Sequence, residues 1–226
     1  LPFKAEFSRR EEDISSKLEV CACARQDGEI RKITLTNHGT EAKTLEIGAF
    51  FEPCICPWAE EAAHPGFNRL TIDAALRRGM LIVEKRPREG VQGRCLYTKL
   101  VSPGDAVYLS DRLKATGRGR TPEQAMLQPV REEDVSSPVM PYASARTRIV
   151  LEPGEGQELF LLMGYADSVN RALEDCEDME GELGECFALA QAHTSGMLTM
   201  AGIEPGKAEL FERMAARAIL GTVPRK

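Results

Sequence analysis

A short run of alternating glycines and arginines contains the residues best suited to bind a ligand. The run is Gly117-Arg118-Gly119-Arg120-Thr121-Pro122. A guanidinium offers several fixed N–H donors to a hydroxyl, a carboxylate or a phosphate, and glycine lets the backbone approach a ligand closely. The run lacks the lysine of a P-loop and the third glycine of a dinucleotide fingerprint. Two interpretations remain, a sugar- or anion-binding loop and an exposed basic turn.

The charge of the chain argues against a nucleic-acid partner. Its 226 residues carry a formal net charge of -6, whereas dedicated nucleic-acid binders are usually basic. Arg-Gly binding of RNA also needs repetition and aromatic partners, and both are missing. No apolar run approaches the ~18 residues that span a bilayer, and no signal peptide is visible. Because the sequence opens with Leu1 rather than Met, we expect it to be part of a longer protein.

The cysteines suggest packing rather than chemistry. There are seven, an odd number without compact scaffold spacing, which argues against a secreted disulfide framework. Two C-x-C pairs stand at positions 21/23 and 54/56. Residues i and i+2 of a strand share a face, buried cysteine behaves as a small hydrophobe, and zinc sites more often use C-x₂₋₄-C. We therefore expect both pairs to be packing residues, and we expect neither a metal site nor a cofactor.

Nucleophilic or acid–base catalysis has little support. The histidines are His38, His64 and His193, none has a partner motif, and no G-x-S-x-G elbow surrounds a serine. Neighbouring acids such as Glu60 and Glu61 are expected on a solvated surface, so no catalytic residue is predicted. The single tryptophan, Trp58, either stacks on a sugar ring or covers the end of the core.

Nine short apolar or alternating segments are expected to position these residues. Each is bounded by Gly, Pro or charged turns, and the sequence EPGEG joins the last two as a hairpin. Many short strands separated by turns indicate an all-β sandwich. The predicted strands are residues 17–23, 29–37, 43–52, 70–75, 80–85, 94–101, 106–110, 146–151 and 157–164.

The pattern becomes helical after Ala166. Ser168 is a predicted N-cap, residues 168–193 carry apolar side chains at helical spacing, and residues 205–220 form a second amphipathic run. The sequence thus predicts a mainly β protein with a sandwich domain over residues 1–166 and a helical linker over residues 167–226. The second helix has no evident partner for its apolar face, which again favours a longer protein.

Six blocks occur in the same order in a known family. They are residues 7–20, 29–39, 50–70, 111–122, 150–173 and 201–220. In these blocks the chain resembles the amino-terminal sandwich domain of cellobiose-phosphorylase-like enzymes, formerly called glycosyltransferase family 36. The phosphorylase-like portion of cyclic β-1,2-glucan synthases is the nearest in likeness. The resemblance covers nearly the whole chain.

This resemblance implies a galactose-mutarotase-like β-supersandwich, then linker helices, then a separate (α/α)₆ barrel. In such enzymes an acid of the barrel protonates the glycosidic oxygen while inorganic phosphate, the co-substrate, attacks the anomeric carbon with inversion. The implied partners are a β-glucan oligo- or polysaccharide and the chain's own barrel. We accordingly expect a non-catalytic domain that is inactive alone. The implied location is the cytoplasm, or the cytoplasmic side of the inner membrane for a glucan synthase.

The resemblance also bears on the arginine run. In related phosphorylases the sandwich lends a loop to the rim of the barrel's active site, so Arg118, Arg120 and Thr121 become candidate ligands of the acceptor sugar. A purely structural role at the domain interface is the alternative. Ala115 and Thr116 depart from the family, which carries large apolar residues there. We expect an ion pair between Asp111 and Arg112 to brace the loop, at ~0–1 kcal/mol if exposed.

Two other kinds of function remain open for the chain. A stand-alone carbohydrate-binding module would need exposed aromatic platforms, which 6% aromatic residues and one Trp make less favourable. A dimerisation module is the other alternative, because related enzymes form homodimers through their sandwich domains.

Overall fold

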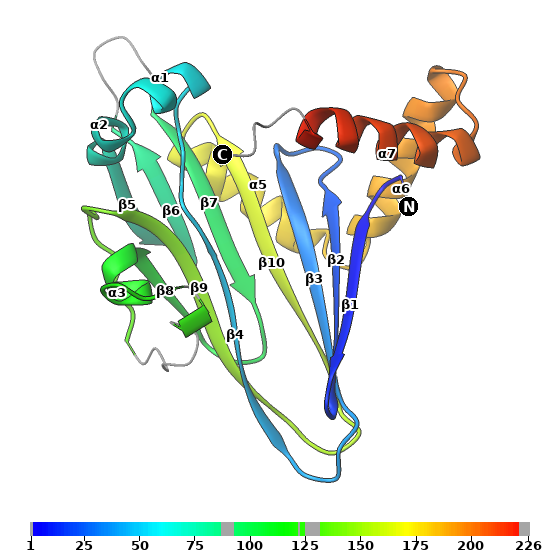
Figure 1. Cartoon of the computed structure of the whole chain (residues 1–226), viewed down its shortest axis with the longest axis horizontal. Helices are drawn as coiled ribbons and strands as arrows, with labels where there is room; N and C mark the ends of the chain where they lie inside the picture. The colour runs from blue at the N-terminus through cyan, green and yellow to red at the C-terminus, as the bar shows by residue number, and fades with distance from the viewer. Residues whose placement is uncertain (1, 87–92, 122, 125–131, 222–226) are drawn as a thin grey trace.

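The computed structural model describes residues 2–86, 93–121, 123–124 and 132–221. Its strands form two antiparallel sheets (Figure 1). Seven of them are ordered β1 (Ala5–Glu11), β2 (Ile14–Ala22), β3 (Gly28–Asn37), β10 (Gly156–Ala166), β7 (Arg94–Val101), β6 (Met80–Lys85) and β5 (Ile72–Arg77). The second sheet has the order β4 (Lys43–Phe51), β9 (Pro141–Leu151) and β8 (Ala106–Asp111).

Six described helices complete the structure. Three short ones follow strands of the sandwich, and three longer ones end the chain. The predicted mainly β class is confirmed. None of the helices in the described part of the chain is long and apolar enough to cross a membrane. The helices are α1 (Trp58–Ala63), α2 (Pro65–Leu70), α3 (Arg112–Thr116), α5 (Val169–Gly181), α6 (Cys186–Met200) and α7 (Pro205–Gly221).

All nine predicted strands are present, but the first strand of the chain was not predicted. β1 lies at the edge of the large sheet, and every one of its residues is exposed. A strand with no buried face lacks the apolar alternation by which strands are recognised. The three short helices were also not predicted, since five or six residues are too few to show a helical period.

The predicted helix over residues 168–193 is two helices. Its start is correct, because the Ser168 hydroxyl accepts a hydrogen bond from the Arg171 amide at 3.2 Å. α5 ends at Gly181, and α6 begins at Cys186 after a turn that contains Gly184. Both glycines disfavour a continuous helix. The proposed boundary between residues 166 and 167 stays a prediction.

Two apolar cores lie on opposite faces of the seven-stranded sheet. The core between the sheets includes Leu161 of β10 and Tyr108 of β8. The other core lies between the large sheet and the helices, and it includes Leu162 of β10 with Met179 of α5. Figure 1 shows α5 crossing the face of the large sheet opposite to β4, β9 and β8. The sequence that follows the last strand is therefore part of the sandwich's packing.

One glycine is fixed by a close approach in the second core. A Cβ placed on Gly164 of β10 would lie 2.2 Å from the hydroxyl oxygen of Tyr97, which is paired with it on β7. The Tyr97 hydroxyl in turn donates to the sulfur of Met179 at 3.3 Å. Burial, and after it the nearby Asp175, raise the pKa of the Tyr97 phenol, so it stays protonated as a donor. The ring therefore covers the bare backbone of Gly164.

Replacing Gly164 by Ala should destabilise the chain by about 1–3 kcal/mol, because the Tyr97 ring must move in a packed core. Urea unfolding followed by circular dichroism measures this. Gly181→Ala is the matched control, since its Cβ meets open space at the end of α5 and should be neutral or slightly stabilising. Equal effects of the two substitutions would contradict the close approach.

Candidate functional site

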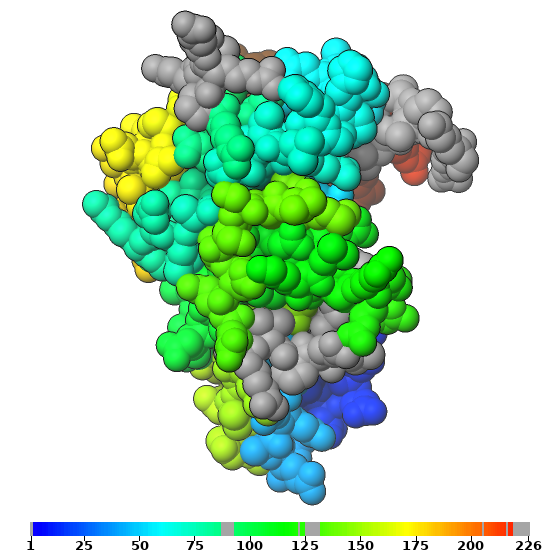
Figure 2. Space-filling view, turned by 90° about the vertical axis from the view of Figure 1, so that its left-hand side faces the viewer, coloured from blue at the N-terminus to red at the C-terminus, as the bar shows by residue number. Residues whose placement is uncertain are grey.

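The arginine run forms a tight loop after α3. Gly117 and Gly119 have φ angles of 79° and 72°, in the left-handed region that favours glycine. The chain therefore turns twice within three residues. Arg118, Arg120 and Thr121 are exposed, and they are called the arginine loop below together with both glycines. In Figure 2 the green surface of α3 and this loop lies on the same face of the molecule as the cyan surface of α1 and α2.

The base of the arginine loop is fixed from inside the protein. Ala115 packs with Leu109 and Tyr142, and Thr116 is also buried. The guanidinium of Arg146, whose residue is only 4% exposed, donates to the Ala115 carbonyl oxygen at 3.0 Å and lies 3.5 Å from the Glu46 carboxylate. Ala115 and Thr116, the two residues before the arginine loop, are thus small and buried next to the Arg146 side chain.

The start of α3 is held differently from the prediction. The Asp111 carboxylate accepts hydrogen bonds from the amides of Leu113 at 2.8 Å and Met140 at 3.2 Å, so it caps the helix. The Arg112 guanidinium pairs with Glu52 at 2.9 Å. The predicted ion pair between Asp111 and Arg112 is wrong, because Asp111 faces backbone donors while Arg112 reaches the segment after β4.

The third residue of the candidate set has a structural role. The Thr121 amide donates to the Gln124 side-chain oxygen at 3.0 Å, and the Gln124 amide donates to the Thr121 hydroxyl at 3.3 Å. This reciprocal pair is a capping box. Its signature, threonine followed three residues later by glutamine, is present in the sequence at Thr121 and Gln124. Pro122 and residues 125–131 lie outside the described residues.

The two arginines are the free part of the loop. Within the described ranges, neither Arg118 nor Arg120 has an ion-pair partner. The Cδ of Arg120 lies 3.2 Å from the place that a Cβ of Gly117 would occupy, so its aliphatic stem folds over that glycine. The loop can thus offer two guanidiniums to an external ligand from a fixed base. The predicted contact with a sugar remains a prediction.

The histidines lie far apart in the described structure, as expected of residues without a shared motif. His38 Nε2 lies 2.9 Å from the Ser15 hydroxyl on the large sheet. His64 separates α1 from α2, where its amide donates to Glu60 and its carbonyl accepts from Asn68. His193 is on α6. The Ser15–His38 contact is an exposed hydroxyl–imidazole hydrogen bond at the surface of the large sheet, and it lines neither of the two hollows described below.

Trp58 does not cover the core. It is the first residue of α1 and is 83% exposed, so the core-covering alternative is wrong. Phe67 and Leu70 of α2 are 56% and 61% exposed. α1 and α2 thus present large apolar side chains on their surface, which suits contact with a sugar ring or with another domain.

The two C-x-C pairs differ in their surroundings. Cys21 is buried in the core beneath α5 and α6, as predicted. Cys54 and Cys56 lie between β4 and α1 rather than in a strand, and Cys54 is exposed. Their sulfur atoms are 3.8 Å apart. The packing prediction is therefore wrong for this second pair, which lies in the irregular segment between the end of β4 and Pro57, the N-cap of α1.

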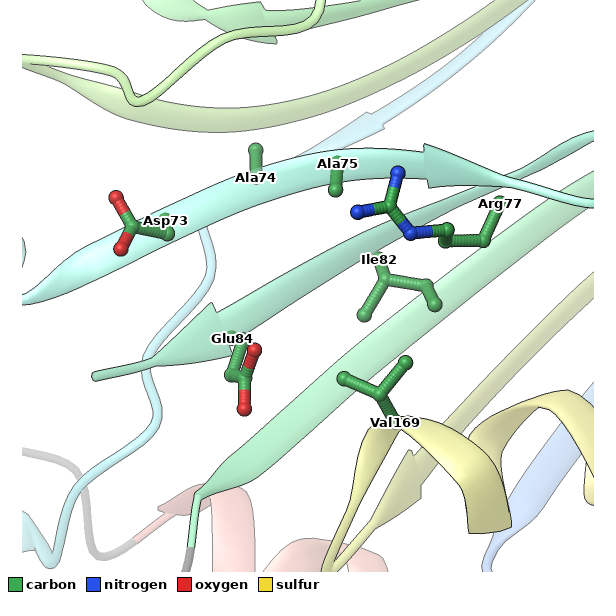
Figure 3. A pocket seen from close by; sticks show the side chains of 7 residues that line it. All are labelled: Asp73, Ala74, Ala75, Arg77, Ile82, Glu84 and Val169. Carbon is green, nitrogen blue, oxygen red and sulfur yellow. The ribbon is translucent and has the colours of Figure 1, made fainter. Parts of the chain in front are cut away.

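Neither of the two hollows found beside described residues resembles a sugar-cleaving site. The smaller has a volume of about 90 Å³ and lies between β5, β6 and the start of α5, where Figure 3 shows Asp73, Arg77, Glu84 and Val169. Asp73 is held there by Arg86 at 2.6 Å and by the Ser137 hydroxyl, which lower the pKa of its carboxyl. That carboxylate is already satisfied.

The larger hollow lies between the sheets and has a volume of about 300 Å³. It is lined mainly by apolar side chains, such as Phe50, Phe51 and Leu161, with Arg31 and Thr98 as its polar members. A glycosidase needs two carboxylates flanking the bond, and no pair of acids lines this hollow. Its volume is near the lower limit of ligand pockets.

Comparison with known proteins gives a family. The family described as "Glycosyl hydrolase 94, supersandwich domain" matches residues 2–182. The cyclic β-(1,2)-glucan synthase NdvB of Rhizobium meliloti (strain 1021) is 29% identical over 129 residues. That match spans 54% of this chain and 5% of the relative, so the chain corresponds to a small part of that protein.

The solved structures that resemble this chain align with low TM-scores and low sequence identity. A putative kojibiose phosphorylase from the human microbiome aligns over 85% of this chain and 22% of its own, with a TM-score of 0.43 and 8% identity. A polysaccharide lyase, BACCELL_00875, aligns over 73% of this chain and 22% of its own, with a TM-score of 0.38 and 15% identity.

Replacing Arg146 by Met should destabilise the chain by about 2–4 kcal/mol, because it removes a charged hydrogen bond to Ala115 and leaves Glu46 without its buried partner. Arg148→Met is the control, since Arg148 is exposed on the same strand. Urea unfolding and the proteolysis rate of the arginine loop measure the effect. Equal stability of both variants would show that the loop base does not depend on Arg146.

Proposed function

Because the chain belongs to the glycosyl hydrolase 94 family through its supersandwich domain, we propose that it is the non-catalytic sandwich of a carbohydrate-active enzyme. The parent enzyme acts on β-glucosides, as a phosphorylase or within a cyclic β-1,2-glucan synthase. Its chemistry takes place in a separate (α/α)₆ barrel, with inorganic phosphate as co-substrate. The likeness to NdvB supports the glucan branch of this proposal.

The observation that carries the proposal is the combination of free guanidiniums and a fixed base in the arginine loop. Arg118 and Arg120 are exposed and without ion-pair partners among described residues, yet their loop stands on the buried Arg146 and the capped α3. A fixed base with free donors is what a binding loop needs, because preorganisation lowers the cost of ordering. In this proposal both arginines face the acceptor sugar of the barrel.

The end of the chain supports docking on another domain. α7 exposes Leu210, Phe211 and Met214, which are 49–58% exposed. Apolar side chains of this size on one helix are typical of a covered face. In the proposed arrangement α7 leads into the barrel and packs against it.

The isolated chain should not release sugar 1-phosphate from β-glucobioses in the presence of inorganic phosphate. The physical reason is that the smaller hollow, lined by Asp73 and Glu84, has a volume of only about 90 Å³, and the larger is lined by no acid. A coupled assay for glucose 1-phosphate tests this, with the parent enzyme as the positive control. Turnover by the isolated chain would contradict the assignment of the chemistry to another domain.

In the parent enzyme, Arg120→Ala should raise the KM for the acceptor sugar about tenfold and leave the KM for phosphate nearly unchanged. A charged hydrogen bond of about 1.5 kcal/mol corresponds to such a factor. Arg10→Ala is the control, since Arg10 is an exposed arginine on the edge strand β1. If Arg120→Ala leaves the acceptor KM unchanged, the loop is only a structural brace at the domain interface.

A further inference from the structure

The turn between β4 and α1 brings two thiols and a carboxylate together. Cys54 Sγ lies 3.8 Å from Cys56 Sγ, and Cys56 Sγ lies 3.5 Å from a carboxylate oxygen of Glu61. The three donor atoms all lie within 4.8 Å of one another. This cluster shares no residue with the arginine loop, and it does not rest on the proposed function.

The backbone of this turn is held by its neighbours. Ile55, between the two cysteines, is 6% exposed and belongs to the core between the sheets. On either side of this buried residue, Cys54 is exposed and Cys56 is half-buried. Glu61 is on α1, one helical turn after Pro57. The two cysteines and the carboxylate therefore meet at the surface from two anchored segments.

The spacings match the edges of a tetrahedral zinc site. A Zn–S bond of about 2.3 Å with tetrahedral angles places two sulfurs about 3.8 Å apart. With a Zn–O bond of about 2.1 Å, sulfur and oxygen lie about 3.6 Å apart. The Cys54–Cys56 distance of 3.8 Å and the Cys56–Glu61 distance of 3.5 Å agree with both edges. A soft thiolate pair selects ions of the zinc class over Mg²⁺ or Ca²⁺.

Glu61 is oriented by a second side chain. The Asn68 amide nitrogen donates to the same Glu61 oxygen at 3.3 Å. Asn68 is 9% exposed, and its backbone is held in α2 by the His64 carbonyl and the Thr71 hydroxyl. A hydrogen bond from an outer residue that fixes a ligand is a usual feature of metal sites.

The local charges favour a cation at this place. The nearby cations pair with other acids, since Lys85 is 3.3 Å from Glu60 and Arg112 is 2.9 Å from Glu52. Among the described residues Glu61 has no ion-pair partner.

We propose that Cys54, Cys56 and Glu61 bind one Zn²⁺ ion, with water in the fourth position. On binding, each thiol loses its proton to solvent and its sulfur donates an electron pair to the metal. Glu61 binds through a carboxylate oxygen, and no atom is oxidised or reduced. The bound ion joins the exit of β4 to α1, and so fixes the surface that carries Trp58.

Titration of this chain with Co²⁺ and Zn²⁺, after reduction and removal of metal, tests the proposal. We expect the visible d–d bands of tetrahedral Co²⁺ at a stoichiometry of one ion, and their loss when Zn²⁺ is added. About two protons should be released per ion near pH 7, so affinity should fall as the pH is lowered. The titratable groups that act on Cys56 are Cys54 and Glu61.

Variants separate this site from the other thiols. Cys54→Ser with Cys56→Ser should abolish the Co²⁺ bands, and Glu61→Gln should weaken Zn²⁺ binding at least tenfold. Cys23→Ser and Glu60→Gln are the matched controls and should bind as the wild type does. Circular dichroism checks that each variant folds. Unchanged bands in the double cysteine variant, or no bands in the wild type, would overturn the proposal.

Discussion

The alternation of side chains along β10 is the constraint on which the rest of the structure depends. β10 pairs with β3 on one side and with β7 on the other. Leu161 enters the core between the sheets, and Leu162 enters the core beneath the helices. A shift of one residue in register would exchange these two faces. Gly164 fixes the register further, because only a residue without Cβ lies beneath the Tyr97 ring.

The sequence predicted the elements that bury apolar side chains and missed those that do not. The EPGEG hairpin and the Ser168 cap were readable because they rest on local turn and cap chemistry. β1 was not, since all of its residues are exposed and its pairing with β2 is a tertiary contact. Residues 168–193 form two helices, α5 and α6, instead of the predicted one. The sequence signal for the break is the pair of glycines, Gly181 and Gly184, which disfavour a continuous helix.

The candidate sites show the same division. The arginine loop was found from its composition, and the left-handed glycines confirm that it is a tight turn. Its support was not readable, because Arg146 stands thirty-one residues from the carbonyl of Ala115 that it binds. The Cys54–Cys56 pair was expected to pack, but Cys54 is exposed. The two prolines that flank the pair place it outside regular strand structure, since proline ends a strand and gives no ladder donor.

The Glu52–Arg112 ion pair connects the two candidate sites, the thiol turn and the arginine loop. Glu52 lies two residues before Cys54, and its carboxylate pairs with Arg112 of α3 at 2.9 Å and with Arg69 of α2 at 3.9 Å. The segment that would hold a zinc ion is therefore tied to the helix from which the arginine loop departs. An exposed ion pair contributes little free energy, but it does set the relative position of two short helices. Fixing the turn at Cys54 and Cys56 restrains Glu52, and through Glu52 it restrains the start of α3. Glu52 is thus the side chain that connects the backbone before Cys54 with the helix from which the arginine loop departs.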